Sequence, residues 1–402
     1  MGSRNAKARE NSPTRIQFVG EAKPYRKDDR MRFEHQRIQQ EKLYMKSAII
    51  LGTRPEIIKM SPIIREFQRR GLEYLILHTG QHYSYDLDMV FFEQLKLPMA
   101  NYNLDVGSGS HAEQTGKMLM GIERIIRQEQ PDIVLVEGDT NTVLAGALAA
   151  TKLRIKVGHV EAGLRSYDRK MPEEINRILV DHCSDYLFAP TEKSKAILLG
   201  EGIPREKIFV TGNTIVDAVY QNLKIVNSKT DAISKFHLQP KGYLLVTVHR
   251  QENVDDPTRF AGILEGLDTI RHKFGMPVIY PIHPRSQKRM TDFSLPSNDI
   301  KLIEPLDFLS FLQLERDARL ILTDSGGVQE EACILKVPCV TLRDNTERPE
   351  TIEVGSNILA GTFPDRIFMC SKTMLSRENN WRNPFGDGRA SKRILDTLEA
   401  RI

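Results

Sequence analysis

Cysteine is scarce in this sequence of 402 residues, and apolar residues never form a long run. The four cysteines, Cys183, Cys333, Cys339 and Cys370, are scattered and form no C-x-x-C pair. This spacing argues against a disulfide scaffold or a structural zinc site and favours a reducing, cytoplasmic setting. Because a membrane-spanning helix needs about 20 consecutive apolar residues, we expect no transmembrane protein. No apolar stretch follows the opening MGSRNAKARENS, so we also expect no secretory signal.

Motifs of several common enzyme classes are missing as well. The sequence has no G-x-G-x-x-G fingerprint and no Walker lysine motif, which argues against a nicotinamide enzyme and a P-loop NTPase. No two histidines lie four residues apart together with a glutamate on a predicted helix, which is an arrangement that would hold zinc. The sequence therefore predicts neither a metal site nor a cofactor.

Positive charge is concentrated at one end of the chain. Residues 1–44 hold eleven Lys and Arg against six Asp and Glu, a net charge of +5, so the +4 of the whole chain leaves −1 for residues 45–402. A nearly neutral body argues against a general nucleic-acid-binding protein. Residues 1–44 contain few aliphatic side chains, and such a segment cannot bury enough apolar surface to fold. We therefore expect a basic extension, disordered or partly helical, without a catalytic role.

From Met45 onward, short apolar runs alternate with longer amphipathic segments, which is typical of an α/β protein with parallel sheets. We expect strands at 47–52, 74–78, 132–138, 156–160, 186–190 and 207–212, and again at 243–249, 277–283, 300–305, 319–325, 338–343 and 356–361. Helices are expected at 55–70, 112–130, 141–153, 173–184, 192–201, 214–225, 257–274, 285–292, 307–316, 327–336 and 364–376. Two such runs predict two doubly wound, Rossmann-like domains that face a ligand-binding cleft.

The expected domain boundaries follow from this alternation. Residues 45–226 form the N-terminal Rossmann-like domain, the polar stretch 227–242 is a linker, and residues 243–383 form the C-terminal Rossmann-like domain. Residues 384–402 include an amphipathic helix that we expect to pack on the N-terminal domain.

Two strand–helix turns have the features of an anion site. In the first, GTRPE (52–56), glycine allows a close approach, proline favours a helix start, and Arg54 and Lys59 add positive charge. In the second, TDSGGVQEE (323–331), Ser325, Gly326 and Gly327 would expose N–H groups to a diphosphate. Glu331 would accept both hydroxyls of a ribose. An ordinary capped turn is the alternative in both places.

Three carboxylates in the first half lie at strand ends or at a helix start. Asp139 and Glu161 each end a predicted strand, and Glu173 opens a predicted helix with Arg177 on the same face at i+4. A single strand-end carboxylate is more often a helix cap. Two of them beside a Glu/Arg pair favour a catalytic site.

Polar residues also follow strands in the second half. His249 ends the strand YLLVTVH and precedes Arg250, so we expect it to point into the cleft, although a structural role is the alternative. His283 and His82 are weaker candidates of the same kind. The run RDNTERPE (343–350) offers side chains suited to sugar hydroxyls and phosphate.

Eight motifs together resemble those of the non-hydrolysing UDP-N-acetylglucosamine 2-epimerases. They are GTRPEIIKMSPII, VEGDTNTVLAGALAA, GHVEAGLRS, MPEEINR, VTGNTIVDA, VTVHRQEN, LTDSGGVQEEA and LRDNTERPE, in family order from about Met45 to near residue 390. The resemblance implies the glycosyltransferase-B architecture, with a nucleotide-binding C-terminal domain. It also implies a homodimer that interconverts UDP-GlcNAc and UDP-ManNAc without a metal or nicotinamide cofactor.

The resemblance further implies roles for individual residues. The acid/base carboxylates would be Asp139, Glu161 and Glu173, assisted by Arg177 and His249. Positions matching the nucleotide and phosphate contacts are Arg54, Lys59, Phe311, Ser325, Gly326, Gly327, Glu331 and Arg348. Family members eliminate UDP to give 2-acetamidoglucal and then add it back with a proton on the other face. Which carboxylate serves which face stays open.

A second nucleotide-sugar site is a further candidate. Many bacterial members bind a second UDP-GlcNAc as an activator, and Gln81, His82, Arg250 and His283 match parts of that site. The residues after His82 are Tyr83 and Ser84, where those members commonly carry Arg and a long polar residue.

Three other functions remain as alternatives. A hydrolysing epimerase would release UDP and free ManNAc, although its relatives typically diverge at the GTRPE turn. A glycosyltransferase of the same fold would need an acceptor, because fold alone does not fix chemistry. A non-catalytic sugar-nucleotide sensor would not need to keep the acid/base side chains.

Overall fold

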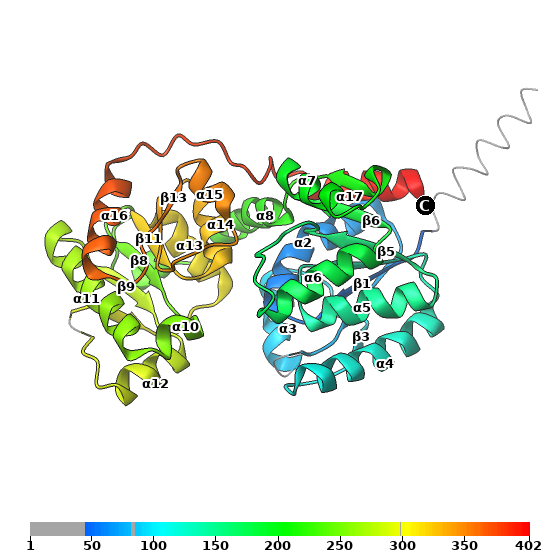
Figure 1. Ribbon diagram of the computed structural model, residues 1–402, viewed down its shortest axis with the longest axis horizontal. Helices are drawn as coiled ribbons and strands as arrows, with labels where there is room; N and C mark the ends of the chain where they lie inside the picture. Colours follow the sequence, from blue (N-terminus) through cyan, green and yellow to red (C-terminus); the bar gives the residue numbers. More distant parts are fainter. Residues whose placement is uncertain (1–44, 82–84, 298) are drawn as a thin grey trace, which may run out of the picture. The chain divides into compact units, whose positions relative to one another are not determined.

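Two parallel β-sheets, each covered by helices on both faces, organise the fold of this computed structural model (Figure 1). The structure describes residues 45–81, 85–297 and 299–402. The sheets follow one another along the chain, and each collects the strands of one half. This arrangement confirms the predicted doubly wound α/β fold.

The first sheet has seven parallel strands in the order β3-β2-β1-β4-β5-β6-β7. They are β1 (Ser47–Leu51), β2 (Tyr74–His78), β3 (Tyr102–Asn103), β4 (Ile133–Glu137), β5 (Lys156–Val160), β6 (Tyr186–Ala189) and β7 (Ile208–Val210). The helices of this half are α2 (Arg54–Arg70), α3 (Tyr85–Gln94), α4 (His111–Glu129), α5 (Asn141–Lys152), α6 (Pro172–Cys183), α7 (Glu192–Gly200) and α8 (Thr214–Lys229), with a 3₁₀ turn at Arg205–Lys207.

Alternate residues of β1 face two different apolar cores. Ile49 and Leu51 pack with α2 and α8, whereas Ala48 and Ile50 pack with α4 and α5. Every residue of β1 is buried, because helices cover both faces of a parallel sheet. This explains why the strand reads as a continuous apolar run in the sequence.

The second sheet has six parallel strands in the order β10-β9-β8-β11-β12-β13. They are β8 (Leu244–Thr247), β9 (Val278–Pro281), β10 (Lys301–Ile303), β11 (Leu320–Thr323), β12 (Cys339–Thr341) and β13 (Asn357–Leu359). The helices are α9 (Ala232–Lys235), α10 (Gln251–Val254), α11 (Pro257–Phe274), α12 (Pro284–Asp292), α13 (Phe308–Asp317), α14 (Gly326–Ile334), α15 (Pro349–Glu353), α16 (Pro364–Ser376) and α17 (Ala390–Arg401).

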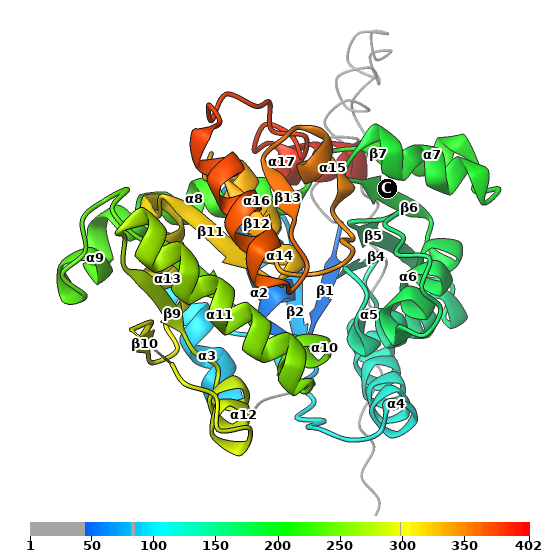
Figure 2. The same cartoon turned by 60° about the vertical axis from the view of Figure 1, so that its left-hand side comes forward.

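The faces of the second sheet are divided between two pairs of helices. Leu244 and Val246 pack with α11 and α16, which lie side by side in Figure 2. Leu245 and Ile321 face the opposite core, which α13 and α14 complete. Helix α8 packs against both α13 and α14, so it joins the two halves of the chain.

The last helix, α17, returns to the first half (Figure 1). Asp217 of α8 accepts a hydrogen bond from the backbone N–H of Ser391 (3.0 Å) at the start of α17. Arg70, at the end of α2, forms ion pairs with Asp396 (2.8 Å) and Glu399. The chain end is therefore fixed by polar contacts as well as by apolar packing.

Several short elements were not expected from the sequence. They are α3, β3, α9, α10 and α15, and two of these have only four residues. Helix α8 runs on to Lys229 and α9 follows at Ala232, so much of the expected linker 227–242 is helical. Among the described helices, none combines the length and apolarity that crossing a membrane requires.

Candidate active site

The carboxyl ends of β1, β4 and β5 meet at one edge of the first sheet, because parallel strands all end on the same side. At the end of β1, Glu56 accepts hydrogen bonds from the backbone N–H of Gly52 (2.6 Å) and from the hydroxyl of Thr140 (2.6 Å). Burial raises the pKa of Glu56 to about 7. A Cβ atom at Gly52 would lie 2.0 Å from Thr79 Oγ1, so the turn requires glycine.

The two cations predicted for this turn have different partners. Arg54 lies over the ring of Phe91, with Cζ 4.8 Å from the ring centre. One helical turn later, Lys59 Nζ lies 2.5 Å from Glu161 Oε2 and 3.3 Å from Glu137 Oε1. Lys59 therefore bridges the carboxylate of the last residue of β4 and the carboxylate that follows β5.

Glu161 also receives contacts from the second half of the chain. Arg348, which follows β12, has Nη2 3.6 Å from Glu161 Oε1 and Nε 2.7 Å from Glu330 Oε1. Asn213, the N-cap of α8, donates to Glu161 Oε2 (3.0 Å) and to Glu330 Oε1 (3.4 Å). The result is a buried ionic network between the ends of the two sheets.

Two neighbouring carboxylates in this network have opposite protonation preferences. Burial opposes the charge of Glu161, but Lys59 and Arg348 lower its pKa to about 2. Burial raises the pKa of Glu137 well above its ordinary value, and the nearby charge of Glu161 adds to this effect. Although burial opposes the charge of Lys59, Glu137 and Glu161 raise its pKa. One carboxylate is therefore ionised beside one that favours its neutral form.

Asp139 lies at the end of β4 and is more accessible than Glu161. Its side chain is 31% exposed, and Arg177 Nη2 pairs with its Oδ2 atom. Asn176 donates to its backbone carbonyl (2.9 Å). Two residues of α6 thus hold this carboxylate where it remains open to a ligand.

Arg177 forms its second ion pair with an unexpected residue. We expected Glu173 to share a face with Arg177, but Nη1 of Arg177 lies 2.7 Å from Glu174 Oε2. Glu174 is buried and accepts backbone N–H groups of Ser166 (2.9 Å) and Tyr167 (2.9 Å). Glu174 therefore fixes the loop after β5, whereas Glu173 is half-buried at the start of α6.

At the edge of the second sheet, a buried aspartate organises the segment after β8. Asp324 accepts the backbone N–H groups of His249 (3.1 Å to Oδ2) and Arg250 (2.9 Å) and the amide of Asn253 (3.1 Å). His249 Nδ1 lies 3.4 Å from Asp324 Oδ1, and the imidazole is 47% exposed. His249 is thus positioned by its backbone while its ring stays accessible.

The start of α14 is open. Ser325 is the N-cap and forms no side-chain hydrogen bond to the described helix. A Cβ atom placed on Gly326 would meet nothing closer than 3.8 Å, and one on Gly327 nothing closer than 4.0 Å. The two glycines therefore leave room for a ligand beside the helix start, as an anion site requires, whereas the backbone N–H of Ser325 is donated to Thr323 Oγ1 (2.9 Å).

The remaining nucleotide candidates lie behind this turn. Glu331 is 8% exposed, and burial raises its pKa to about 7, although a hydrogen bond with the carboxyl group of Glu315 opposes this rise. Phe311 of α13 is partly buried against the core that contains Val328 and Ala332 of α14. The structure therefore places both candidates in the α13–α14 region.

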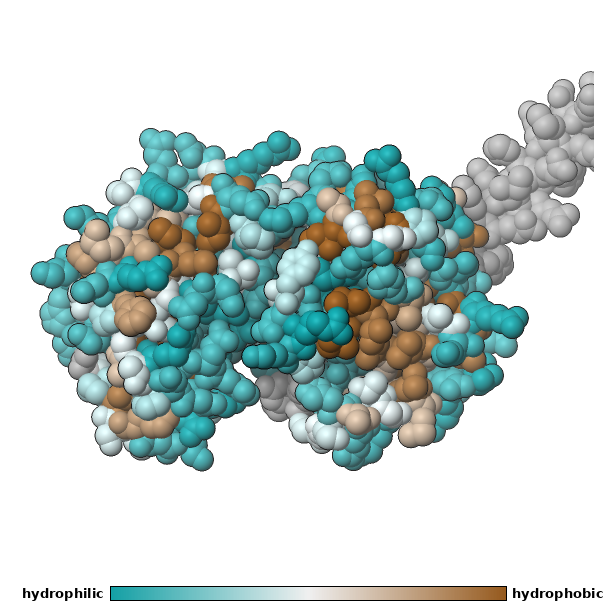
Figure 3. All heavy atoms as spheres, viewed as in Figure 1, coloured by the Kyte–Doolittle hydropathy of each residue, from teal (hydrophilic) through white to brown (hydrophobic). Residues whose placement is uncertain are grey.

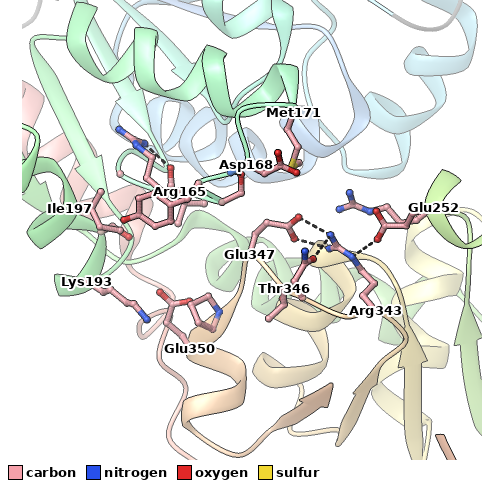
Figure 4. A pocket seen from close by; sticks show the side chains of 18 residues that line it. Arg165, Asp168, Met171, Lys193, Ile197, Glu252, Arg343, Thr346, Glu347 and Glu350 are labelled. Atoms are coloured by element: carbon pink, nitrogen blue, oxygen red, sulfur yellow. Dashed lines mark hydrogen bonds and ion pairs between the residues drawn. The ribbon is translucent and has the colours of Figure 1, made fainter. Parts of the chain in front are cut away.

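A cavity of about 450 Å³ adjoins the loop that follows Glu161, and its lining includes Arg250 but neither Asp139 nor Glu161. It lies between the loop after β5, the start of α7 and the segment 343–350 (Figure 4). Figure 4 shows Arg343 held between Glu347 and Glu252; its Nη1 lies 2.8 Å from Glu347 and its Nε 2.9 Å from Glu252. The volume is within the range of about 300–1,000 Å³ that is common for ligand sites.

The candidates for a second nucleotide-sugar site are placed separately. The Gln81 side chain is buried and accepts the backbone N–H of Thr142 (3.1 Å), so it supports the start of α5. Arg250 lines the cavity, and His283 is the N-cap of α12. Burial, followed by the charges of His249 and Arg285, lowers the pKa of His283. His82 lies outside the described residues.

Sequence reasoning missed several members of the site. Glu137, Glu174, Asn213, Glu330 and Asp324 all lie within motifs that drew attention to other residues. Glu174 and Glu330 stand next to candidates in glutamate pairs, and Asn213 has the usual identity of a helix N-cap. Across the described ranges, no three His, Cys, Asp or Glu side chains are arranged to hold a metal ion.

Comparisons with known proteins bear on this geometry. A family model described as UDP-N-acetylglucosamine 2-epimerase matches residues 65–399. The UDP-N-acetylglucosamine 2-epimerase of Methanocaldococcus jannaschii is 56% identical over 361 residues, which cover 88% of this chain and 99% of that protein. A crystal structure of the M. jannaschii UDP-GlcNAc 2-epimerase in complex with UDP-GlcNAc and UDP has a TM-score of 0.82 at 56% identity, covering 89% of this chain and 100% of that chain. The UDP-2,3-diacetamido-2,3-dideoxy-D-glucuronate 2-epimerase of Pseudomonas aeruginosa is 41% identical over 358 residues, covering 88% of this chain and 99% of that protein.

Proposed function

Because the chain belongs to the UDP-N-acetylglucosamine 2-epimerase family of isomerases, we propose that it interconverts UDP-GlcNAc and UDP-ManNAc by the non-hydrolysing route. One observation carries the proposal. Of the two strand-end carboxylates of the first sheet, Glu161 lies beside Arg348 and Asp139 is held by Arg177, and the second sheet contributes the start of α14, which has no side-chain cap. Proton-transferring groups and anion-binding groups are thus combined at one site.

The chemistry requires both kinds of group. The C2 proton of the sugar is not next to a carbonyl, so its direct removal is unfavourable. In the proposed route the C2–H bond and the C1–O bond to UDP both break, which yields 2-acetamidoglucal and bound UDP. UDP then bonds to C1 again, and C2 takes a proton on the opposite face. No net oxidation occurs, so no redox cofactor is needed.

The first-sheet carboxylates supply the proton transfers in this proposal. Glu161 is ionised through its contacts with Lys59 and Arg348, which suits a group that accepts a proton or stabilises positive charge at C1. Asp139 is the accessible partner, held by Arg177. Glu173 at the start of α6 is the third acid/base candidate, and His249 assists from the second sheet. Which carboxylate serves which face of the sugar stays open.

The second sheet stabilises the leaving group in this proposal. Loss of UDP leaves negative charge on the diphosphate, which the Ser325 hydroxyl and the N–H groups of Gly326 and Gly327 would stabilise. Arg348 and Arg54 add positive charge, Glu331 accepts the ribose hydroxyls, and Phe311 lies beside the nucleotide. Such preorganised dipoles need little rearrangement as the C1–O bond breaks.

The test is to incubate UDP-GlcNAc with the protein in deuterated water and to record proton NMR spectra. We expect UDP-ManNAc to form and deuterium to enter C2 of both epimers, because the glycal is reprotonated by groups that exchange with solvent. Epimerisation without label at C2 would contradict this route. Accumulation of free UDP and ManNAc would instead identify the hydrolysing alternative.

A second substrate is favoured by one comparison, the relative whose name specifies a UDP-diacetamido-dideoxy-glucuronate. A glucuronate adds a carboxylate at C6, which a cation near the sugar must balance. Arg250 and Lys193 line the cavity and are candidates for that role. Parallel assays of the two UDP-sugars decide between them: our proposal requires the larger kcat/KM with UDP-GlcNAc.

We also propose that the chain forms a homodimer. Figure 3 shows apolar side chains gathered over α5 and α6. Leu179 of α6 is 44% exposed, and Met120 of α4, which packs on α5, is 69% exposed. Light scattering coupled to gel filtration should give twice the monomer mass, and Leu179→Asp should reduce it; a monomeric wild-type protein contradicts the proposal.

A further inference from the structure

A group of buried polar side chains lies behind the strand-end carboxylates and has no role in the proposed chemistry. His159 of β5 and Asp181 of α6 are each 1% exposed. His159 Nδ1 lies 2.7 Å from Asp181 Oδ1, and Nε2 lies 2.9 Å from the carbonyl oxygen of Gly138. Since Gly138 directly precedes Asp139, this group ends at the backbone of a catalytic candidate.

Both partners of His159 are hydrogen-bond acceptors. A carboxylate and a backbone carbonyl both accept hydrogen bonds, so an N–H on either ring nitrogen has a partner. The charged groups around the ring are Asp181 from α6 and Arg165 from the segment after β5. Arg165 Nη2 lies 2.7 Å from Asp181 Oδ2 and 2.6 Å from Glu201 Oε2, so these charges compensate one another.

Asp181 also holds the backbone beyond β5. Its Oδ2 atom accepts the N–H of Gly163 (3.2 Å), so Asp181 is bonded to residues on both sides of Glu161. Glu161 has φ = 70°, in the left-handed region that non-glycine residues seldom adopt. At Gly163, where φ is 84°, a Cβ atom would lie 2.5 Å from the carbonyl oxygen of Ser194. Side-chain contacts therefore maintain an unfavourable backbone conformation at Glu161.

From this geometry we infer that Asp181 and His159 are positioning residues that set the places of both Asp139 and Glu161. His159 fixes the Gly138 carbonyl and so the turn that carries Asp139. Asp181 fixes the two flanks of Glu161. The inference rests on the proposed catalytic roles of Asp139 and Glu161. It adds the residues that fix the positions of these two carboxylates relative to each other.

The same strand offers a matched control at its opposite end. Asp185 Oδ2 accepts the backbone N–H of Val157 (3.1 Å) near the start of β5, away from the site. Asp185 is also a carboxylate that holds β5 through a hydrogen bond. If Asp181 only stabilises the fold, replacing Asp181 and replacing Asp185 should have similar effects. If Asp181 positions the catalytic candidates, only its replacement should lower kcat.

The experiment measures kcat, KM and UDP affinity for Asp181→Asn and Asp185→Asn. We expect Asp181→Asn to lower kcat by about tenfold to a hundredfold, a loss comparable to that for removing a group that orients a metal ligand. UDP affinity by calorimetry should stay within about twofold, because the proposed UDP contacts come from other elements. Asp185→Asn should keep kcat even if it lowers the melting temperature.

Two variants of His159 separate its contacts. The amide nitrogen of Gln can replace Nε2 and donate to Gly138, whereas that of Asn replaces Nδ1 and donates to Asp181. We expect His159→Gln to retain the larger kcat, because it keeps the bond that positions Asp139. Equal kcat for the two variants overturns the inference. If Asp181→Asn does not fold, this comparison of His159→Gln with His159→Asn tests the inference in its place.

Parallel measurements of Asp139→Asn and Glu161→Gln keep the inference distinct from the proposed function. If these two variants are inactive while folded Asp181→Asn and His159→Asn keep kcat within about threefold of wild type, the positioning roles are wrong and the proposed function stands. If Asp139→Asn and Glu161→Gln remain fully active, the proposed catalytic roles fail, and the inference built on them falls too.

Discussion

The two sheets present contrasting surfaces at their carboxyl ends. At the first sheet, Lys59 forms an ion pair with Glu161 and also contacts Glu137, and all three side chains are almost entirely buried. At the second sheet, the start of α14 has no side-chain cap, and its two glycines have space around them. The first arrangement fixes charged side chains in a set geometry, and the second leaves room for an anion. In our proposal, this contrast separates the two tasks: the carboxylates of the first sheet transfer protons, and the start of α14 in the second sheet binds the diphosphate.

The strongest test of this contrast removes the charges of the first sheet. Asp139→Asn and Glu161→Gln should each lower kcat by roughly 10²–10⁴, the usual loss for a general acid or base. Both should bind UDP nearly as wild type does, because the second sheet supplies the proposed phosphate contacts. Steady-state kinetics and calorimetry provide the readouts. A kcat loss below tenfold removes that residue from the catalytic set.

Arg348 joins the two surfaces, so its loss should affect both binding and stability. Arg348→Ala leaves Glu330, which is 1% exposed, without its ion-pair partner. Breaking a buried ion pair costs about 3 kcal/mol of unfolding free energy. UDP affinity should fall as well, since a cation near the phosphates is lost. Urea unfolding and calorimetry measure the two effects.

The double variant Arg348→Ala/Glu330→Gln sharpens that test. Removing the uncompensated carboxylate should restore part of the lost stability but none of the UDP affinity. Recovery of UDP affinity in the double variant would contradict a direct phosphate contact by Arg348.

Protonation of Glu331 should make nucleotide binding depend on pH. Burial raises its pKa to about 7, so it is largely protonated at pH 6 and ionised at pH 8. Because ribose hydroxyls donate to the carboxylate form, affinity at pH 6 should be about tenfold weaker than at pH 8. UDP-GlcNAc titrated into Asp139→Asn avoids turnover, and Glu331→Gln is the control that should lose this dependence. Equal affinity at both pH values contradicts the ribose role.

The same raised pKa has a consequence for stability. Glu331 holds its proton more tightly in the folded protein than in the unfolded chain, so its contribution is present at low pH. That contribution is lost as pH rises from about 4.5 through about 7. Nucleotide binding should therefore improve over a pH range in which this group stabilises the free protein less.

The smallest effect is expected from residues outside both sheets. Deleting residues 1–44 should leave kcat and KM unchanged, because this segment carries none of the recognised motifs. Electrostatic attraction of an anionic substrate would be screened at physiological salt, where the Debye length is about 8 Å. Paired kinetics of the full chain and a Met45-start protein at low and physiological salt give the readout. Loss of activity in both conditions would make the extension part of the working structure.

Much of the fold was predictable because the strands are short, apolar and regularly spaced. The expected strands at 74–78 and 156–160 match β2 and β5 at both ends. Helix α3 and strand β3 were missed, because helix α3 lacks a strong apolar periodicity and β3 has only two residues. The sequence pattern also gave no reason to extend α8 into the expected linker.

The site residues at strand ends were predictable from the sequence. The ion pairs that join residues of distant elements were not. Asp139 and Glu161 are conspicuous, since a carboxylate follows an apolar run. The pairing of Lys59 with Glu137 and Glu161 joins residues separated by 78 and 102 positions, and spacing alone does not reveal it. Arg177 could reach either Glu173 or Glu174 along a helix, and only the packing of the 166–167 loop selects Glu174.

The most direct test of the central claim follows the bond between the sugar and UDP. UDP-GlcNAc carrying ¹⁸O in the bridge between C1 and the β-phosphorus is incubated with the protein, and ³¹P NMR follows the label. If the first sheet drives elimination while the second retains UDP, ¹⁸O should move into the non-bridging β-phosphate positions in wild type. Asp139→Asn should abolish this exchange while UDP still binds. Epimerisation with the label fixed in the bridge would contradict the account.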